Sequence, residues 1–199
     1  MKITQKKLFK TQVLDFDDSK LHITTSKLGN KNEFDISFES IFTEKYHIKE
    51  SSLILFFSAA FFYLLSFALY YWRFIQHDKN IEEEAFVFWA IVATILLALG
   101  ILFLQNFWKI NLAGGSFLKI YKNSPAKSEV DHFIEELFNR RNEYLKKMYG
   151  HINPNLDYEN QHNNFRWLLN MKVFSTLEFE EKVRSLDEIF NKNSTKIGF

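Results

Sequence analysis

The residues that could carry out chemistry are scattered along this chain, and none falls into a recognised catalytic or metal-binding spacing. The histidines are His22, His47, His77, His132, His151 and His162. His132 and Glu136 lie four positions apart and would share one face of a helix, but a zinc site needs three or four ligands. We therefore expect the histidines to be solvent-facing polar residues, and we predict no metal site.

The acidic and glycine-rich segments also have structural explanations. Glu178, Glu180 and Glu181 could provide acid–base catalysis, but a helix cap and solvated carboxylates explain them better. The pair Gly114-Gly115 lacks the spacing and the Lys-Ser/Thr ending of a phosphate-binding loop, so we expect a tight turn between strands. The absence of cysteine excludes thiolate nucleophiles and disulfides. We predict a non-enzymatic protein without a cofactor; the alternative is a membrane enzyme whose groups converge only in three dimensions.

Two long segments without a charged side chain dominate the chain. Residues 51–72 and 85–108 would form helices of roughly 33 and 36 Å, and the hydrocarbon core of a bilayer is ~30 Å thick. A helix satisfies its own backbone in lipid, where no water can do so. The sequence therefore predicts a transmembrane hairpin over 51–108, with a connecting loop at 73–84.

Charge near these segments predicts the orientation of the hairpin. The 73–84 loop contains two basic and four acidic residues, whereas lysines flank the outer ends of both segments. Because positive residues remain on the cytoplasmic side, we expect both termini in the cytoplasm and the loop outside. A composition rich in Lys, Asn, Ile and Phe is typical of AT-rich bacterial genomes. We predict a multi-pass protein of the bacterial inner membrane. A net charge of +1 gives no reason to expect a nucleic-acid partner.

The segment before the hairpin, residues 1–50, is predicted to contain cytoplasmic β-strands. Phe34, Ile36 and Phe38 alternate with polar residues, the pattern of a strand with one buried face. Polar turns at 17–20 and 29–32 separate the apolar runs. These features predict a β-meander of about three strands, with an apolar face that needs a cover.

The segment 109–150 is predicted to continue the sheet and to end in an amphipathic helix over 126–149. Ser124 would cap this helix, Pro125 would occupy its first turn and Gly150 would end it. We expect the strands on both sides of the hairpin to complete one small sheet covered by this helix, so that the hairpin is inserted between strands. The alternative is two independent β segments.

The remaining segment, 151–199, is predicted to form a small helical hairpin. Ser175 and Glu178 have the spacing of a capping box, and Phe174 and Phe179 have that of a hydrophobic staple. The core of such a unit is too thin to be stable alone. We expect it to pack on the sheet domain or on a partner chain.

Two segments resemble known families. The run GGSFLKIY at 114–121, leading into EVDHFIEEL at 129–137, resembles the pleckstrin-homology-like (PH-like) domains of bacterial membrane proteins. The run LLNMKVFSTLEFEEK at 168–182 is similar to the short C-terminal domain called SHOCT, although Val173-Phe174 replaces the glycine common in its turn. The second resemblance implies oligomerisation or partner binding rather than chemistry.

The fold class predicted is thus membrane α+β: a two-helix hairpin inserted in a small PH-like sheet domain, followed by an amphipathic helix and a C-terminal helical hairpin. We expect a scaffold or interaction subunit that recruits a protein partner or self-associates; the alternative is a lipid-recognising module. The candidate partner-binding residues are Phe165, Trp167, Leu168, Phe174, Phe179, Val183 and Leu186. The candidate lipid-headgroup residues are Arg140, Arg141, Lys146 and Lys147, which could equally form a solvated helix face.

Overall fold

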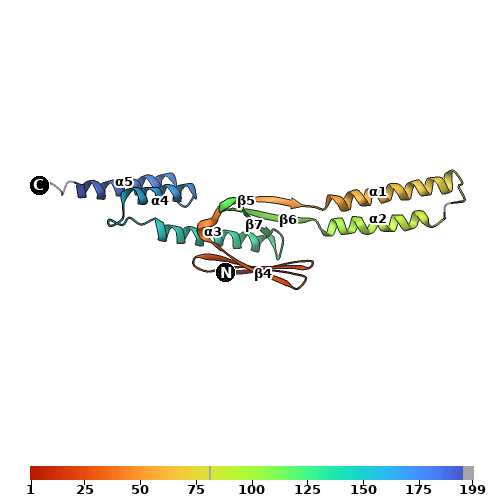
Figure 1. Cartoon of the computed structure of the whole chain (residues 1–199), viewed down its shortest axis with the longest axis horizontal. Helices are drawn as coiled ribbons and strands as arrows, with labels where there is room; N and C mark the ends of the chain where they lie inside the picture. Colours follow the sequence, from red (N-terminus) through yellow and green to blue (C-terminus); the bar gives the residue numbers. More distant parts are fainter. Residues whose placement is uncertain (81, 195–199) are drawn as a thin grey trace. The chain divides into compact units, whose positions relative to one another are not determined.

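The described part of the chain has a mixed α+β fold with two sheets and five α-helices (Figure 1). A computed structural model describes residues 1–80 and 82–194; position 81 of the predicted loop and positions 195–199 of the predicted C-terminal segment lie outside the described residues. Contacts divide the chain into two compact units. The sheet unit comprises Met1–Tyr46 and Trp108–Phe199, and the hairpin unit comprises His47–Phe107.

The first sheet is a four-stranded antiparallel meander. Its strands are β1 (Lys2–Lys7), β2 (Lys10–Phe16), β3 (Lys20–Lys27) and β4 (Asn30–Ser37). The turn predicted at 17–20 is present, and Asp17 Oδ1 accepts hydrogen bonds from the backbone N–H of Ser19 and Lys20, at 2.7 and 2.8 Å. The sequence pattern missed β1 because its buried position 5 is a glutamine, which interrupts the apolar alternation. Phe34 is also a departure, since it is exposed rather than buried.

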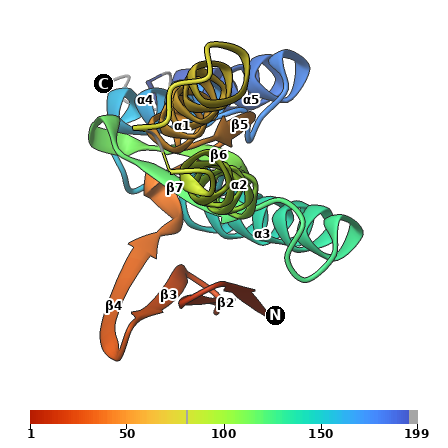
Figure 2. The same ribbon diagram turned by 90° about the vertical axis from the view of Figure 1, so that its right-hand side faces the viewer.

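The second sheet contains strands from both sides of the hairpin. Its order is β5-β6-β7, with β5 at Ile41–Glu50, β6 at Gln105–Leu112 and β7 at Phe117–Tyr121. The prediction of a single sheet is therefore wrong, because β1–β4 form a sheet of their own (Figure 2). The prediction that segments before and after the hairpin share a sheet holds for β5 and β6.

Both sheets contribute to one core, which the helix α3 (Lys127–Tyr149) completes. Its members are Ile3, Leu14, Phe16, Leu21, Ile23, Ile36, Phe38, Ile41, Ile110, Leu118, Ile120, Val130, Phe133, Ile134 and Leu137. The ring of Phe133 on α3 lies 5.3 Å from that of Phe16 on β2. Burial of these side chains supplies the main stabilisation of the sheet unit.

Two buried glutamines join β1 and β2 to β7 across the gap between the sheets. Gln5 Nε2 donates to the carbonyl oxygens of Tyr121 and Ser124, at 2.8 and 2.7 Å, and Gln5 Oε1 accepts from the N–H of Tyr121 at 3.0 Å. Gln12 Nε2 donates to the carbonyl of Lys119 at 3.1 Å. The amide side chains thus take the place of a backbone ladder.

The ends of α3 differ from each other in how well they were predicted. Ser124 does not cap the helix: the helix begins after Ala126, and the Ser124 hydroxyl bonds to the backbone of Lys6 instead. Gly150 does end it. A Cβ at Gly150 would lie 2.6 Å from the Lys146 carbonyl oxygen and 3.1 Å from the Phe174 ring, so close packing requires glycine here.

The helices α4 (Tyr158–Asn170) and α5 (Thr176–Ser194) form the predicted helical hairpin. Asp157 begins α4 by accepting a hydrogen bond from the N–H of Asn160. The capping box is confirmed: Glu178 accepts from the Ser175 N–H at 2.8 Å, and Ser175 Oγ accepts from the Glu178 N–H at 3.2 Å. The helical hairpin of α4 and α5 packs on Leu145 of α3, so its apolar face is covered within the chain.

The hairpin unit contains two helices that are long and apolar enough to cross a membrane. They are α1 (Leu53–Tyr70), which continues as a π-helical turn over Tyr71–Ile75, and α2 (Ala85–Leu102). The prediction of helix up to position 108 is wrong, because β6 begins at Gln105. Trp108, the last position of the predicted segment, lies in that strand and packs against the core of the sheet unit.

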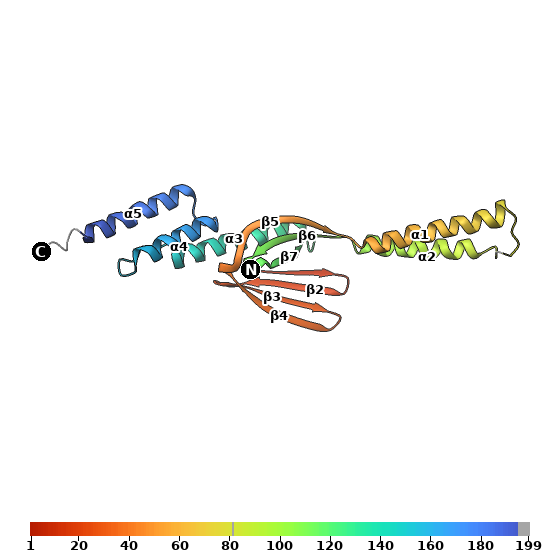
Figure 3. The same ribbon diagram turned by 45° about the horizontal axis from the view of Figure 1, so that its top comes forward.

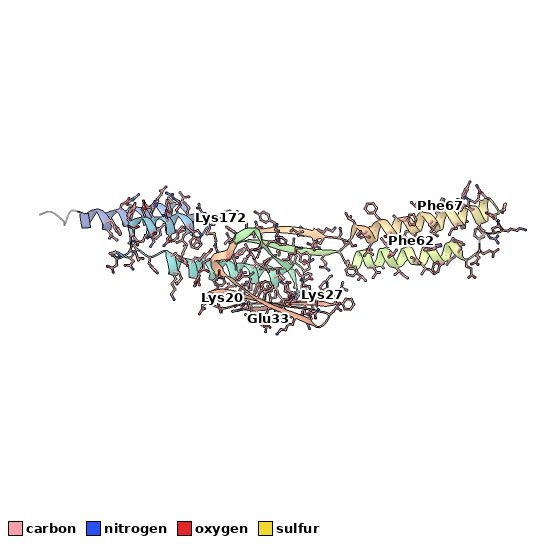
Figure 4. All side chains as sticks on the ribbon, in the orientation of Figure 1. Lys20, Lys27, Glu33, Phe62, Phe67 and Lys172 are labelled. Atoms are coloured by element: carbon pink, nitrogen blue, oxygen red, sulfur yellow. The ribbon has the colours of Figure 1, made fainter. Side chains whose placement is uncertain are left out.

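Within the hairpin, α1 and α2 pack through small and aromatic side chains. Ala59, Ala93 and Gly100 are buried between the helices, and a Cβ at Gly100 would lie 3.3 Å from the Phe56 ring. Phe62 stacks on Trp89 with ring centroids 5.0 Å apart (Figure 4). Only 11% of the most apolar 18-residue stretch of each helix is buried, so most large side chains of the hairpin unit face outward.

Candidate functional site

The residues predicted to bind a partner lie mostly inside the chain. Phe165, Leu168 and Leu186 are fully buried, and Phe174 is 6% exposed. Trp167 and Phe179 are partly buried against the same cluster. The Tyr149 ring also packs there, with its centroid 5.2 Å from that of the Trp167 ring. α4 and α5 use these positions to pack on each other and on α3, in agreement with the expectation that the helical hairpin packs on the sheet domain or on a partner chain. Partner binding by these residues stays a prediction.

Polar contacts fix this helical hairpin to α3 and to the strand side of the unit. Lys146 Nζ lies 2.7 Å from Glu178 Oε1. That hydrogen bond, together with the Ser175 N–H, lowers the pKa of Glu178 to about 2. Lys172 in the turn before α5 pairs with Glu44 of β5 at 2.5 Å. α3 itself is joined to the segment before β5 by Tyr144, which donates to Glu39 at 2.9 Å.

The basic stretch of α3 does not lie on one exposed face. Arg141 is fully buried, where it donates to the carbonyl oxygen of Met171 at 3.0 Å and to Asn142 at 2.7 Å. Burial lowers its pKa to about 10. The prediction that Arg141 faces a lipid headgroup is therefore wrong. Positions 140, 141, 146 and 147 do not fall on one side of a helix with 3.6 residues per turn, and position 141 falls on the core side.

The other three basic residues of the stretch remain accessible, with different surroundings. Arg140 lies 3.7 Å from Glu143, and Arg140 and Lys147 border a shallow groove that also contains Asp18 and Ser19. Lys146 is committed to Glu178. Alternating charges thus surround the stretch, so its binding of headgroups stays a prediction.

His22 is held between two carboxylates. Its Nδ1 lies 2.6 Å from Asp35 Oδ1, and its Nε2 lies 3.0 Å from Asp17 Oδ2. These hydrogen bonds raise the pKa of His22. The group is exposed and joins β3 to β4 and to the β2–β3 turn. In the described part of the chain, no group of three or more His, Asp or Glu has the arrangement of a metal site.

A surface that sequence reasoning missed lies at one end of the four-stranded sheet. The β1–β2 and β3–β4 turns are adjacent there (Figure 3), and the N–H of Leu28 donates to the carbonyl of Phe9 at 3.4 Å. Leu8, Phe9 and Leu28 are 50%, 70% and 73% exposed. We call these three residues the sheet tip. The available signal was an apolar residue in each of two short turns, KKLFK and SKLGN.

Lysines surround the sheet tip. Lys7 pairs in register with Lys10, and Lys10 pairs with Lys27, so three lysines lie side by side across β1, β2 and β3. We call them the lysine row. The opposite end of the sheet contains Asp17 and Asp35, and Figure 4 places Lys20 and Lys27 at opposite ends of β3.

Comparison of the chain with protein families, curated proteins and solved structures found no match.

Proposed function

We propose that the chain is a non-enzymatic, membrane-anchored scaffold or interaction subunit of the bacterial inner membrane, with both termini in the cytoplasm. The observation that carries the proposal is the exposure of the apolar hairpin. Large side chains such as Ile54, Phe57 and Phe61 are 79%, 73% and 61% exposed. Apolar surface of this extent is costly in water, and lipid would remove the cost.

The polar groups of the hairpin support the same environment. Ser66 donates to the Phe86 carbonyl at 2.7 Å, and Thr94 Oγ1 donates to the Ala90 carbonyl at 2.8 Å. Tyr63 donates to Thr94 Oγ1 at 2.9 Å. Hydroxyl groups inside a bilayer need such partners because lipid offers none.

We also propose that the sheet unit is a PH-like domain and that α4 and α5 form a SHOCT-like unit. The support for the first is the succession of four-stranded sheet, three-stranded sheet and covering helix in one core. The support for the second is the capping box that opens α5. Because the predicted partner-binding residues are buried, we assign partner recruitment to exposed apolar side chains at the two ends of the helical hairpin: Leu156 before α4 and Leu177 at the start of α5 are 53% and 73% exposed.

The anchor and the scaffold role need separate experiments. Carbonate washing should leave the protein in membranes, and protease added outside intact spheroplasts should not reach tags at its ends. Extraction by carbonate, or cleavage of the tags, would contradict the anchor and its orientation.

The scaffold role is tested on protein purified from native membranes, by light scattering and by identification of co-purifying chains. We expect a complex that the double change Leu156→Ser with Leu177→Ser weakens. The control Phe117→Ser, at an exposed ring of β7, should leave the complex intact. A monomer without a bound chain would contradict the scaffold role.

A second candidate function, lipid recognition by the sheet unit, is favoured by the lysine row beside an exposed apolar tip. It predicts that the protein prefers anionic to neutral bilayers.

A further inference from the structure

We propose that the sheet tip inserts into the surface of an anionic bilayer, as a membrane contact additional to the hairpin. The inference rests on the proposed membrane anchor and assigns the lipid contact to Leu8, Phe9 and Leu28 with the lysine row. It places the contact away from the C-terminal part of α3, where the candidate headgroup residues were predicted.

The backbone conformation at the sheet tip indicates that the turns themselves do not favour apolar side chains at these positions. Leu8 and Leu28 each have φ 48°, in the left-handed region. Asn and Gly adopt this conformation readily, whereas other residues incur a cost of about 1 kcal/mol or more. Leucine at both positions is therefore locally unfavourable and also exposes apolar surface to water. Local strain of this kind is characteristic of functional positions.

The lysine row is likewise unfavourable in water alone. Like charges placed directly opposite each other on neighbouring strands repel. Among the described residues, Lys7, Lys10 and Lys27 form no ion pair that would offset this repulsion, although Lys10 Nζ lies over the Tyr121 ring, 5.8 Å from its centroid. An anionic bilayer surface would attract each well-placed lysine by about 1 kcal/mol. The same surface would accept the apolar tip, so a single occupant accounts for both features.

The position of the tip in the sheet unit agrees with this occupant. Lys6, next to the tip, contacts Ser124 just before α3, and Lys45 on β5 pairs with Asp131 near the start of α3 at 3.3 Å. Glu39, before β5, contacts Tyr144 near the end of α3. β5 therefore runs toward the end of the unit that carries the tip.

The covalent chain limits how far a bilayer can be from this end. The first apolar helix begins at Leu53, about seven positions after Tyr46 of β5, and an extended chain spans about 25 Å over that length. A bilayer that contains the helix therefore begins within reach of the end of β5. The carboxylates Asp17 and Asp35 belong to the other end of the sheet, away from the anionic surface.

The absence of native cysteine makes a direct test possible on the full chain. Phe9→Cys and Leu28→Cys are labelled singly with an environment-sensitive fluorophore, and the protein is placed in phosphatidylglycerol or phosphatidylcholine nanodiscs with quencher-labelled lipid. Ser19→Cys, in the turn at the opposite end of the sheet, is the matched control, and Phe67→Cys reports on the hairpin.

We expect blue-shifted, lipid-quenched emission at positions 9 and 28 in anionic nanodiscs, with loss of the effect in neutral lipid and at high salt, and none at position 19. Labels at 9 and 28 that match position 19 while position 67 is quenched would overturn the proposal. A blue shift without lipid quenching would mean that protein covers the tip, and equal quenching in both lipids would remove the role of the lysine row; either overturns it. An unquenched label at position 67 would instead contradict the membrane anchor.

A second variant separates insertion from folding. Leu28→Asn retains a residue suited to φ 48° and removes the apolar side chain. We expect it to abolish quenching at a label on position 9 while the melting temperature of the sheet unit stays the same or rises. In a further variant, Lys10→Gln and Lys27→Gln are added to Leu28→Asn. If the label at position 9 were still quenched to the same extent in this triple variant, the proposal would also be overturned.

Discussion

The sheet unit and the hairpin unit use the same apolar residue types in opposite ways. In the sheet unit, Phe16, Phe38 and Phe133 are buried in a shared core. In α1 and α2 of the hairpin unit, Phe57, Phe61 and Phe67 are 61% to 73% exposed, and the buried positions are taken by alanine, glycine and serine. The first arrangement is that of a protein stabilised by water exclusion, and the second is that of helices whose solvent is lipid. Phenylalanine is therefore buried in one part of the chain and exposed in the other, and variants of a single protein can compare the two arrangements in the same sample.

Phenylalanine truncation should break the comparison most strongly. Phe133→Ala removes a fully buried ring that contacts Phe16, and we expect it to destabilise the sheet unit by about 3–5 kcal/mol. The matched change Phe67→Ala, at an outward-facing ring of α1, should leave the unfolding of the sheet unit unaffected. Thermal unfolding of both variants in nanodiscs provides the measurement. Equal losses would mean that the hairpin ring is also packed in a core.

Charge insertion should sharpen the comparison from the other side. Leu64 in α1 and Leu177 in α5 are similarly exposed, at 69% and 73%. Arginine at the centre of a membrane helix costs about 2.5–3.5 kcal/mol, whereas an exposed position in water costs little. We expect Leu64→Arg to reduce the carbonate-resistant fraction and Leu177→Arg to leave it unchanged. If both variants remained fully membrane-bound, the assignment of lipid to α1 would be contradicted.

Buried polar contacts in the sheet unit provide the next test. Gln5→Ala would leave the Tyr121 N–H and two carbonyl oxygens without their partner, so we expect a loss of about 1–3 kcal/mol. The exposed Gln76, at the end of the π-helical turn, is the control. Chemical denaturation followed by circular dichroism measures both. A neutral Gln5→Ala would mean that water replaces the side chain.

The sequence predicted features that depend on neighbours in the chain better than those that depend on distant segments. The Ser175–Glu178 cap and the turn at Asp17 were predicted because their partners lie within three positions. Gln5 bonds to Tyr121, 116 positions away, and its polarity concealed β1. Helical periodicity places position 141 on the core side of α3, but the carbonyl oxygen of Met171 that Arg141 contacts there lies 30 positions away and could not be predicted. The sheet tip was missed because polar composition is expected in turns, and exposed leucines there carry no periodic signal.

The α5 cap should show a smaller effect with a defined pH dependence. Ser175→Ala removes an N-cap and should cost about 1 kcal/mol. The pKa of Glu178 falls from its ordinary 4.5 to about 2 on folding. Its contribution to stability is therefore complete above pH 4.5 and is lost as the pH falls toward 2. Melting temperatures of wild type and Glu178→Gln should converge over that range. A constant difference between them would exclude the charge of Glu178 as the cause.

The smallest expected effect is at His22, and its sign is opposite to that of Glu178. Hydrogen bonds to Asp17 and Asp35 raise the pKa of His22 above 6.5, so the folded chain binds this proton more tightly than the unfolded chain does. The resulting stabilisation is complete below pH 6.5 and is lost as the pH rises through the raised pKa. His22 and its two carboxylate partners are exposed to solvent, so the difference in stability between wild type and His22→Gln should be small and should shrink in high salt. Thermal unfolding between pH 5 and 9 measures it. His22 and its two carboxylate partners belong to the sheet unit alone. This pH dependence should therefore accompany the loss of near-ultraviolet circular dichroism from the aromatic residues of that unit, such as Tyr144 and Trp167. Lipid quenching of a label at position 67, in the hairpin unit, should not change with it.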